Sequence, residues 1–306
     1  MTTQLLTGLV SAPFTPMHVD GSLNLDAIAP YADLLTRNGV SGAFICGTTG
    51  ESLSLTLDER VEIAQEWVSA ARDELKVIVH VGGTCLADCQ TLAREAQDAG
   101  AAAIGVMAPC FFKPPDVQAL VDWCQAIASA GPNLPFYFYH LPSMTGVSFA
   151  MADFLPQAAG RIPSLAGVKF TYEDLDDYQR CLAFDGGRLN VLFGRDEILV
   201  QALRLGARGA VGSTYNFAPG LYKRIIAAHE AGDSATADAL QKRAVDMIDT
   251  CIRASRSGTP AFKAVMKMIG LDCGPARLPL RPLSDDEAER LRDQLQALGF
   301  FEYCAR

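Results

Sequence analysis

The sequence predicts a (β/α)8 barrel followed by a C-terminal helical region, and two observations lead to that prediction. Short apolar runs rich in β-branched residues recur about eight times, and segments with apolar residues at helical spacing lie between them. Strand followed by helix, repeated in this way, is typical of such a barrel. An open doubly wound sheet is the main rival. It usually has fewer strands and a phosphate-binding glycine loop after the first, where this chain has SAPFTPM.

The expected strands are followed by a different pattern near the end of the chain. The strands are GLVSAPF, GAFICG, VIVHVG, AIGVMAP, PFYFYH, AGVKFT, NVLFG and GAVGS, beginning near residues 8, 42, 77, 103, 135, 166, 190 and 209. Helical stretches follow them, which predicts a barrel over residues 1–224 and a helical region packed on it over residues 225–306. Acidic residues 285–287 and Gly299 are expected to mark the two ends of the last helix.

Composition narrows the classes of function. The chain has 26 basic and 35 acidic residues, so it lacks the positive field that nucleic acid or an anionic membrane surface requires. No apolar run reaches the roughly 20 residues of a membrane span and the first residues lack a signal peptide's charged start, so we expect a cytoplasmic protein. Nine cysteines without a CxxC pair predict reduced, structural thiols and no metal site.

Polar residues gather where the expected strands end. Chemistry in this barrel belongs at the C-terminal ends of the strands. Five of these ends carry polar or glycine-rich groups: GTTGE at 47–51, Tyr139 with His140, Lys169 with Thr171, GRDE at 194–197, and GST at 212–214. A random scatter of polar residues would not favour one rim of the barrel.

Lys169 stands between Val168 and Phe170 in an apolar run. Strand alternation turns the two apolar residues to one face, toward the surrounding helices, and the lysine to the other, toward the barrel mouth. Tyr139 would then lie at the end of the adjacent strand, roughly 5 Å away at the backbone. The pattern alone leaves a structural role for Lys169, as a strand-end lysine or half of a buried ion pair, equally open.

A buried lysine at a barrel mouth has a specific chemical use. A neutral amine attacks a ketone to form an imine, which accepts electrons from a breaking C–C bond. Lowering the lysine pKa from about 10.4 to about 7.5 requires disfavouring the charge by roughly 4 kcal/mol, and we expect Val168 and Phe170 to provide the apolar surroundings. A tyrosine hydroxyl such as that of Tyr139 can then move the protons. Lys113, in a loop at the same rim, is the rival nucleophile.

The turn at residues 47–50 suits an anion. Its glycines let backbone N–H groups approach an anion closely, and the two threonine hydroxyls add donors. The carboxylate of a keto acid is therefore a suitable ligand for this turn. Such a turn before a helix is also often a simple N-terminal cap.

The motifs GTTGE, YHLPSMTG, GVKFT, FGRDE and GSTYN, in this order, resemble the pyruvate-dependent aldolase family that contains N-acetylneuraminate lyase and dihydrodipicolinate synthase. GLVSAPFTPM and GPARLPL extend the resemblance over nearly the whole chain. It implies a (β/α)8 barrel with C-terminal helices, usually a homotetramer, that works without a metal or an organic cofactor. It also implies that Lys169 is the Schiff-base lysine and Tyr139 the proton-relay tyrosine.

The resemblance further implies a substrate, with Thr48 and Thr49 binding the carboxylate of pyruvate. YH before the proline and GSTYN favour the lyase branch, which cleaves N-acetylneuraminate reversibly to pyruvate and N-acetylmannosamine. In that branch the residues expected to hold the sugar's hydroxyl tail match Thr171, Gly194, Asp196, Glu197 and Ser213. The alternatives are another 2-keto-3-deoxy sugar acid, the synthase reaction, or a non-catalytic relative that binds a keto acid.

Two departures from the synthase pattern weaken that alternative. Met144 stands where synthases typically have a carboxylate-binding arginine, and a thioether cannot form that pair. Phe111 and Phe112 stand where synthases carry tyrosines, one of which joins the relay of a neighbouring subunit. Substrate groups, Ser143 or His140 could complete the relay, although alternation turns His140 away from Tyr139 and favours a structural role for it.

Overall fold

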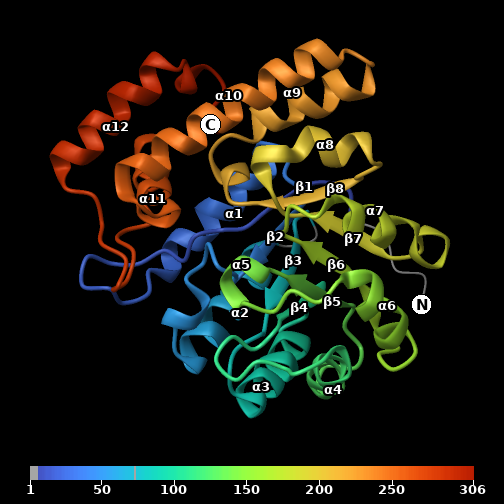
Figure 1. The fold of residues 1–306 in the computed structure, drawn as a ribbon. Coiled ribbons are helices and arrows are strands. Elements are labelled where there is room, and N and C mark those ends of the chain that lie inside the picture. The colour runs from blue at the N-terminus through green and yellow to red at the C-terminus, as the bar shows by residue number, and fades with distance from the viewer. Residues whose placement is uncertain (1–5, 72–73) are drawn as a thin grey trace.

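The computed structural model describes residues 6–71 and 74–306, and within them eight parallel strands close into a barrel (Figure 1). The strands are β1 (Gly8–Ser11), β2 (Gly42–Ile45), β3 (Lys76–His80), β4 (Ala103–Met107), β5 (Phe136–His140), β6 (Leu165–Phe170), β7 (Asn190–Phe193) and β8 (Gly209–Gly212). Neighbours in the chain pair with each other, and β1 pairs with β8 to close the sheet. The predicted fold is confirmed, and every strand begins within one residue of its predicted start.

The helices form an outer layer and a C-terminal group. Those that follow the strands are α1 (Ile28–Arg37), α2 (Leu57–Ala71), α3 (Leu86–Asp98), α4 (Val117–Ala128), the short α5 (Pro142–Thr145), α6 (Met151–Ala159), α7 (Leu175–Ala183), α8 (Leu199–Arg204) and α9 (Pro219–Glu230). The C-terminal group is α10 (Ser234–Ser255), α11 (Gly258–Met268) and α12 (Asp285–Ala297). The predicted boundary between residues 224 and 225 falls inside α9, and the division into two parts stays a prediction.

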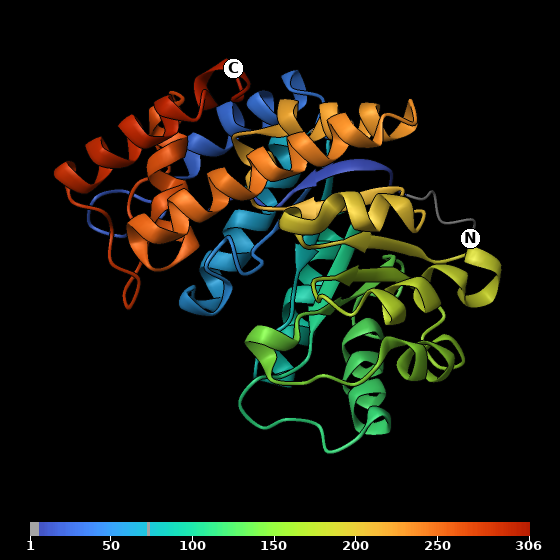
Figure 2. The ribbon, with the colours of Figure 1, turned by 45° about the horizontal axis from the view of Figure 1, so that its top comes forward.

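The C-terminal helices lie over one side of the barrel. Figures 1 and 2 show α10 running along α9, with α11 and α12 beyond it. Gln241 of α10 donates to the backbone oxygen of Asp196, 2.9 Å away, so this helix reaches the chain just after β7. α12 begins with a capping box between Ser284 and Glu287 and is followed by Gly299 at φ 71°, as its acidic start and closing glycine predict.

Strand alternation sorts the apolar side chains into two cores. Tyr137 and Tyr139 belong to the core inside the barrel, whereas Phe136 and Phe138 pack between the strands and the helices. This arrangement confirms the predicted faces of β5.

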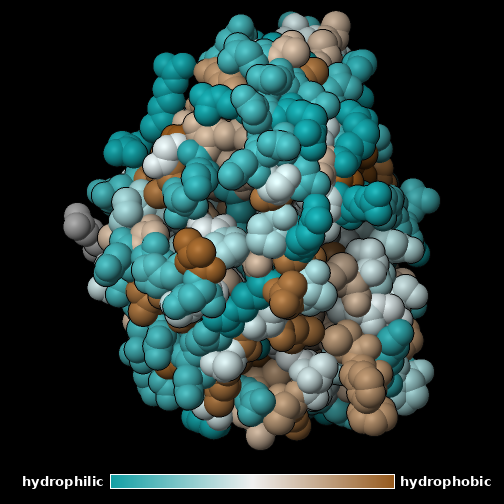
Figure 3. Space-filling view, turned by 90° about the vertical axis from the view of Figure 1, so that its left-hand side faces the viewer, coloured by the Kyte–Doolittle hydropathy of each residue, from teal (hydrophilic) through white to brown (hydrophobic). Residues whose placement is uncertain are grey.

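The hydropathy of the surface differs between the upper and lower parts of one side of the molecule. Figure 3 shows the side on which α11 and α12 lie in Figure 1, with mostly hydrophilic residues above and several hydrophobic patches below. Among the described residues, no helix is long and apolar enough to cross a membrane.

The cysteines in the described part of the chain are all free. Cys89 is buried in α3, whereas Cys85, four residues earlier, is an exposed residue that precedes the helix. Burial raises the pKa of the Cys89 thiol to about 12, so it stays protonated and packs as a small apolar group.

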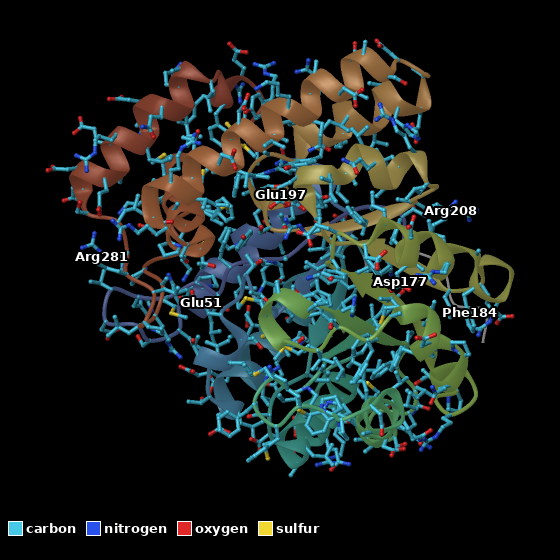
Figure 4. All side chains as sticks on the ribbon, in the orientation of Figure 1. Glu51, Asp177, Phe184, Glu197, Arg208 and Arg281 are labelled. Carbon is cyan, nitrogen blue, oxygen red and sulfur yellow. The ribbon has the colours of Figure 1, made fainter. Side chains whose placement is uncertain are left out.

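Asp177 connects two outer helices through a buried carboxylate. It lies on α7, labelled in Figure 4, and accepts the backbone N–H groups of Met151 (2.7 Å) and Ala152 (2.9 Å). These two groups begin α6 and have no partner within their own helix, so Asp177 caps α6 from a neighbouring helix.

Replacing Asp177 by alanine is therefore expected to destabilise the fold by about 2–4 kcal/mol, because two buried N–H groups lose a charged acceptor. Asp176→Ala, at the exposed neighbouring position, is the matched control and should change stability by less than about 0.5 kcal/mol. Urea denaturation measures both. Equal stability of the two variants would contradict the capping role.

Candidate active site

A cavity of about 200 Å³ lies at the C-terminal ends of the strands. Each of the nine residues that the sequence predicts for the site lines it: Thr48, Thr49, Tyr139, Lys169, Thr171, Gly194, Asp196, Glu197 and Ser213. They come from the ends of β2, β5, β6, β7 and β8, which the closed barrel brings to one rim. The roles assigned to them stay predictions, but their gathering around one space is a property of the fold.

Lys169 places its ammonium group over two aromatic rings. Its Nζ atom is 3.9 Å from the ring centroid of Phe44 and 4.1 Å from that of Tyr139. Burial lowers the pKa of Lys169 to about 7, while the negative charge of Asp196 acts in the opposite direction. A large fraction of the amine is therefore neutral at pH 7 and able to attack a carbonyl carbon.

The apolar surroundings of this amine differ from those expected. Val168 and Phe170 face outward, into the core between barrel and helices, as alternation predicts. The expectation that they also desolvate the amine is wrong, because the rings over it are those of Phe44 and Tyr139 on the inner face. Sequence analysis missed Phe44 since its contact with Lys169 joins two distant strands.

Tyr139 pairs in register with Lys169 across β5 and β6, which confirms the predicted adjacency. Its hydroxyl oxygen is 3.3 Å from Oγ1 of Thr48, in the turn after β2. Burial raises the pKa of Tyr139 to about 12, and the hydroxyls of Thr48 and Thr171 act in the opposite direction. Tyr139 therefore holds its proton at neutral pH and can donate it to a molecule bound beside the amine.

Asp196 is a buried carboxylate just after β7, in the 3-10 turn Asp196–Ile198. Its Oδ2 accepts the backbone N–H (3.1 Å) and the hydroxyl (2.7 Å) of Thr214, which the sequence analysis placed at the polar rim without assigning it a role. In the described part of the protein its Oδ1 has no hydrogen-bond partner. Burial, followed by the charge of Glu197, raises the pKa of Asp196 to about 6. At pH 7 the carboxylate is mostly ionised and keeps one acceptor atom for a ligand.

Two glycines allow polar side chains to approach the ends of β7 and β8. A Cβ on Gly194 would collide with Oγ1 of Thr171, and one on Gly212 would collide with the carboxylate of Asp196. Any larger residue at either position would displace a group that lines the cavity. The shape of the site therefore requires a glycine at position 194.

The hydroxyl-bearing residues at the rim are reachable from solvent. Thr48 is exposed, and Thr49 and Ser213 are half-buried. Their hydroxyls come from the turns after β2 and β8, which are neighbours of β1 on either side. They can therefore donate to different parts of one bound molecule.

The C-terminal helices contribute residues that the sequence analysis did not select, and Arg195, from the predicted polar rim, joins the site without having been assigned a role. Ile248 and Ile252 of α10 and Phe262 of α11 line the cavity with apolar surface. Arg195 also lines the cavity and pairs with Glu197, at an Nε–Oε2 distance of 3.5 Å. Figure 4 shows Glu197 beside α10. The spacing of the two isoleucines indicates a shared helix face, but no sequence signal shows that this face meets the barrel mouth.

Other polar residues considered from the sequence lie away from the cavity. Lys113, in the loop after β4, and Ser143, in the short helix α5, are exposed and do not line it. His140 stacks against Phe170 and Tyr172 on the outer face, so it points away from Tyr139 as predicted. Burial lowers the pKa of His140 to about 4 and keeps it neutral, consistent with a packing role. Within residues 6–71 and 74–306, no group of three His, Cys, Asp or Glu side chains could hold a metal ion.

Comparison with known proteins finds the same architecture and similar sequences. The Dihydrodipicolinate synthetase family matches residues 5–298. N-acetylneuraminate lyase from Mus musculus is 40% identical over 299 residues, covering 96% of this chain and 93% of the mouse protein. The solved structure of Proteus mirabilis N-acetylneuraminate lyase has a TM-score of 0.94 and 38% identity, covering 97% of this chain and 100% of that one. N-acetylneuraminate lyase from Aliivibrio salmonicida has a TM-score of 0.94 and 40% identity, covering 97% and 98%.

Burial of the Lys169 amine is expected to make the stability of the fold depend on pH. In the folded chain the pKa of Lys169 is about 7, below its ordinary value of 10.5, so the unfolded chain binds the extra proton between these values and stability rises with pH there. At and below about pH 7 the folded chain bears the full cost of burying the ammonium group. This cost is up to about 5 kcal/mol, and the favourable contacts with the two rings offset part of it. We expect Lys169→Met to raise stability by about 2–4 kcal/mol at pH 7 and by much less at pH 10.

Guanidinium denaturation at the two pH values measures this difference. Lys113→Met removes an exposed lysine and should leave stability within about 0.5 kcal/mol of the parent at both. A Lys169→Met protein less stable than the parent at pH 7 would contradict the assigned cost of burial.

Proposed function

The chain belongs to the Dihydrodipicolinate synthetase family, and from that membership we propose that it cleaves N-acetylneuraminate reversibly to pyruvate and N-acetylmannosamine. The observation that carries the proposal is the buried amine of Lys169, with a pKa of about 7, in register with Tyr139 at the barrel mouth. Relatives about 40% identical over nearly the whole chain bear the name of this lyase, which supports the choice of substrate.

The first step joins the substrate to the enzyme. The neutral Nζ of Lys169 attacks the keto carbon, C2, of the open-chain sugar acid, and a carbinolamine forms. Tyr139 gives its proton to the carbinolamine hydroxyl, which leaves as water, and the tyrosine becomes a phenolate while the lysine becomes a protonated imine. The high pKa of Tyr139 makes it a donor that recovers its proton readily afterwards.

The second step breaks the bond between C3 and C4. The phenolate of Tyr139 accepts the proton of the C4 hydroxyl, C4 becomes the aldehyde of N-acetylmannosamine, and the electron pair moves to the imine nitrogen to give an enamine. Tyr139 then returns the proton to C3 and is again a phenolate. Water adds to the protonated pyruvate imine and gives its proton to Tyr139, and the carbinolamine that forms breaks down to pyruvate and the neutral amine of Lys169. The imine is the electron sink, so the proposal needs no metal and no organic cofactor.

We assign the keto acid's carboxylate to the turn after β2. Thr48 and Thr49 line the cavity, and Oγ1 of Thr48 lies 3.3 Å from the Tyr139 hydroxyl, so a carboxylate held there sits next to both the amine and the proton donor. Hydroxyl donors without a net charge suit a site in which a positive charge appears on the imine during each turnover.

The polyhydroxyl tail is assigned to the opposite rim. Asp196 and Glu197 line the cavity with carboxylates, of which that of Glu197 lies closer to solvent, and Thr171 and Ser213 supply hydroxyls. Gly194 lets the side chain of Thr171 approach the end of β7 and so keeps its hydroxyl at this rim. Carboxylates beside hydroxyl groups are suitable partners for a sugar because each sugar OH can donate to one of them.

Another 2-keto-3-deoxy sugar acid is the alternative substrate that fits the same chemistry. The synthase reaction is disfavoured because Met144, whose side chain is 62% exposed, does not line the cavity and cannot pair with a carboxylate. A keto-acid-binding relative without activity is disfavoured by the lowered pKa of Lys169, which a binding protein does not need.

Trapping the imine tests the mechanism. Incubation with pyruvate and borohydride is expected to modify Lys169, located by mass spectrometry of the digested protein. The initial rate should rise as pH increases through about 7, since the amine loses its proton there. Lys113→Met should be modified normally, and modification at Lys113 in the parent protein would overturn the mechanism.

Product release tests the substrate. We expect pyruvate to be released from N-acetylneuraminate faster than from shorter 2-keto-3-deoxy sugar acids, and Tyr139→Phe to lower kcat by roughly 10²–10⁴-fold. Release from a shorter sugar acid with none from N-acetylneuraminate would keep the mechanism and replace the substrate.

A homotetramer is the assembly we propose. Phe111 and Phe112, in the loop after β4, are 76% and 85% exposed and pack edge to face, 4.9 Å between centroids. Large apolar side chains exposed together are typical of a contact surface. Phe111→Asp with Phe112→Asp is expected to dissociate four copies of the 32.8 kDa chain, measured by light scattering, whereas Val19→Asp, at another exposed apolar position, should not. A parent protein of monomer mass would overturn this assembly.

The cytoplasm is the location we propose. The unpaired cysteines of the described chain, six of them buried, suit a reducing compartment.

A further inference from the structure

The last residue of the GTTGE motif has an unfavourable backbone conformation. Glu51 has φ 61° and ψ 23°, in the left-handed region that residues with a Cβ seldom adopt. Cys46, just before the turn, has φ 54° and is in the same region. The turn that carries Thr48 and Thr49 is thus bounded by two strained residues, and contacts from elsewhere must hold it.

The contacts on Glu51 come from the C-terminal region. Its Oε1 is 2.7 Å from Nζ of Lys263 on α11, and the two side chains are only 1% and 2% exposed. Its Oε2 accepts the backbone N–H of Arg277 at 2.7 Å. Lys263 also donates to the backbone oxygen of Pro275 at 2.8 Å. Figure 4 shows Glu51 close to the segment that follows α11.

The side chain of Arg277 fastens the segment that follows the turn. Its guanidinium donates to the backbone oxygens of Gly21 (2.7 Å) and Ser54 (3.0 Å) and pairs with Glu59 at the start of α2. Arg277 therefore anchors the residues that follow Glu51, together with the distant Gly21, to the C-terminal segment.

The turn transmits this anchoring to the cavity. Oγ1 of Thr48 is 3.3 Å from the Tyr139 hydroxyl, and the backbone oxygen of Gly50 accepts the Thr15 hydroxyl at 2.7 Å. A hydrogen bond of this length does not survive a displacement of about 1 Å in the turn. The position of Thr48 relative to Tyr139 thus depends on what holds Glu51.

We propose that Lys263, through Glu51, and the side chain of Arg277, through Ser54 and Glu59, act as positioning residues that hold the Thr48–Thr49 turn in place for the substrate carboxylate. Neither Lys263, Arg277 nor Glu51 lines the cavity, so their effect is indirect. A buried ion pair contributes little net stability compared with an apolar pair of similar size, which favours a geometric role for this one. The inference rests on the proposed function, in which Thr48 and Thr49 bind that carboxylate.

The test replaces the charged pair by a neutral one and compares two carbonyl compounds. Glu51→Gln combined with Lys263→Met leaves no unpaired buried charge, so the fold should be retained. Borohydride trapping on Lys169 is then measured with pyruvate, and with hydroxyacetone, which has the ketone but no carboxylate. We expect the half-saturating pyruvate concentration to rise between about tenfold and 100-fold, with that for hydroxyacetone unchanged.

A merely structural role would not separate the two compounds. In a double variant that folds, loss of trapping with both compounds, or an unchanged half-saturating pyruvate concentration, would overturn the inference. Lys242→Met with Asp246→Asn removes an exposed ion pair of 2.8 Å on α10 and should leave both values unchanged.

A second variant covers the case in which the double variant does not fold. Arg277→Met removes a side chain that is 20% exposed and leaves the Glu51–Lys263 pair intact. It is expected to raise the pyruvate half-saturation several-fold and to spare hydroxyacetone; no change would overturn the inference. A parent protein that fails to trap pyruvate would instead overturn the proposed function, so the two failures are distinguishable.

Discussion

The desolvation of one ammonium group is the constraint on which the site depends. Lys169 loses its charge near pH 7 because it is buried inside the closed barrel, where Phe44 and Tyr139, from two other strands, lie next to Nζ in place of water. Asp196 limits the effect, since its negative charge favours the ammonium form. The balance matters chemically: a lower pKa would give a weaker nucleophile, and a higher one would leave too little neutral amine at pH 7. The same tyrosine covers the amine and supplies the proton, so burial and catalysis share one residue.

The barrel alone does not complete this site. Ile248 and Phe262 bring apolar surface from the C-terminal helices, and Lys263 holds Glu51 beside the turn after β2. Because α9 spans the predicted boundary at residue 225 and α10 packs along it, the helical region and the barrel share packing as well as function. A change in the C-terminal helices can therefore alter substrate binding without touching the substrate.

The local sequence pattern predicted the fold, but it predicted only part of the site. Strand starts, the faces of β5 and β6, and the polar rim followed from alternation, because burial imposes period two on each strand. Contacts across the barrel had no such signal, so Phe44 was missed. Lys263 and Lys267 show the same limit: they stand four residues apart on α11, yet Lys263 is buried against Glu51 while Lys267 is 71% exposed and pairs with Asp272. No local pattern distinguishes a helical lysine that meets a distant carboxylate from one that meets water.

Three locally unfavourable features lie at one rim of the barrel: the buried amine of Lys169, the left-handed backbone of Glu51, and the raised pKa of the buried Asp196. Such features persist only where surrounding contacts outweigh them, and they are typical of functional sites. Away from the rim, the buried carboxylate of Asp177 is paired through both of its oxygens with the start of α6. The contrast has a physical reason. A carboxylate that caps a helix stabilises the fold by satisfying its partners, whereas Lys169 and Oδ1 of Asp196 keep bonding capacity for a molecule that comes and goes.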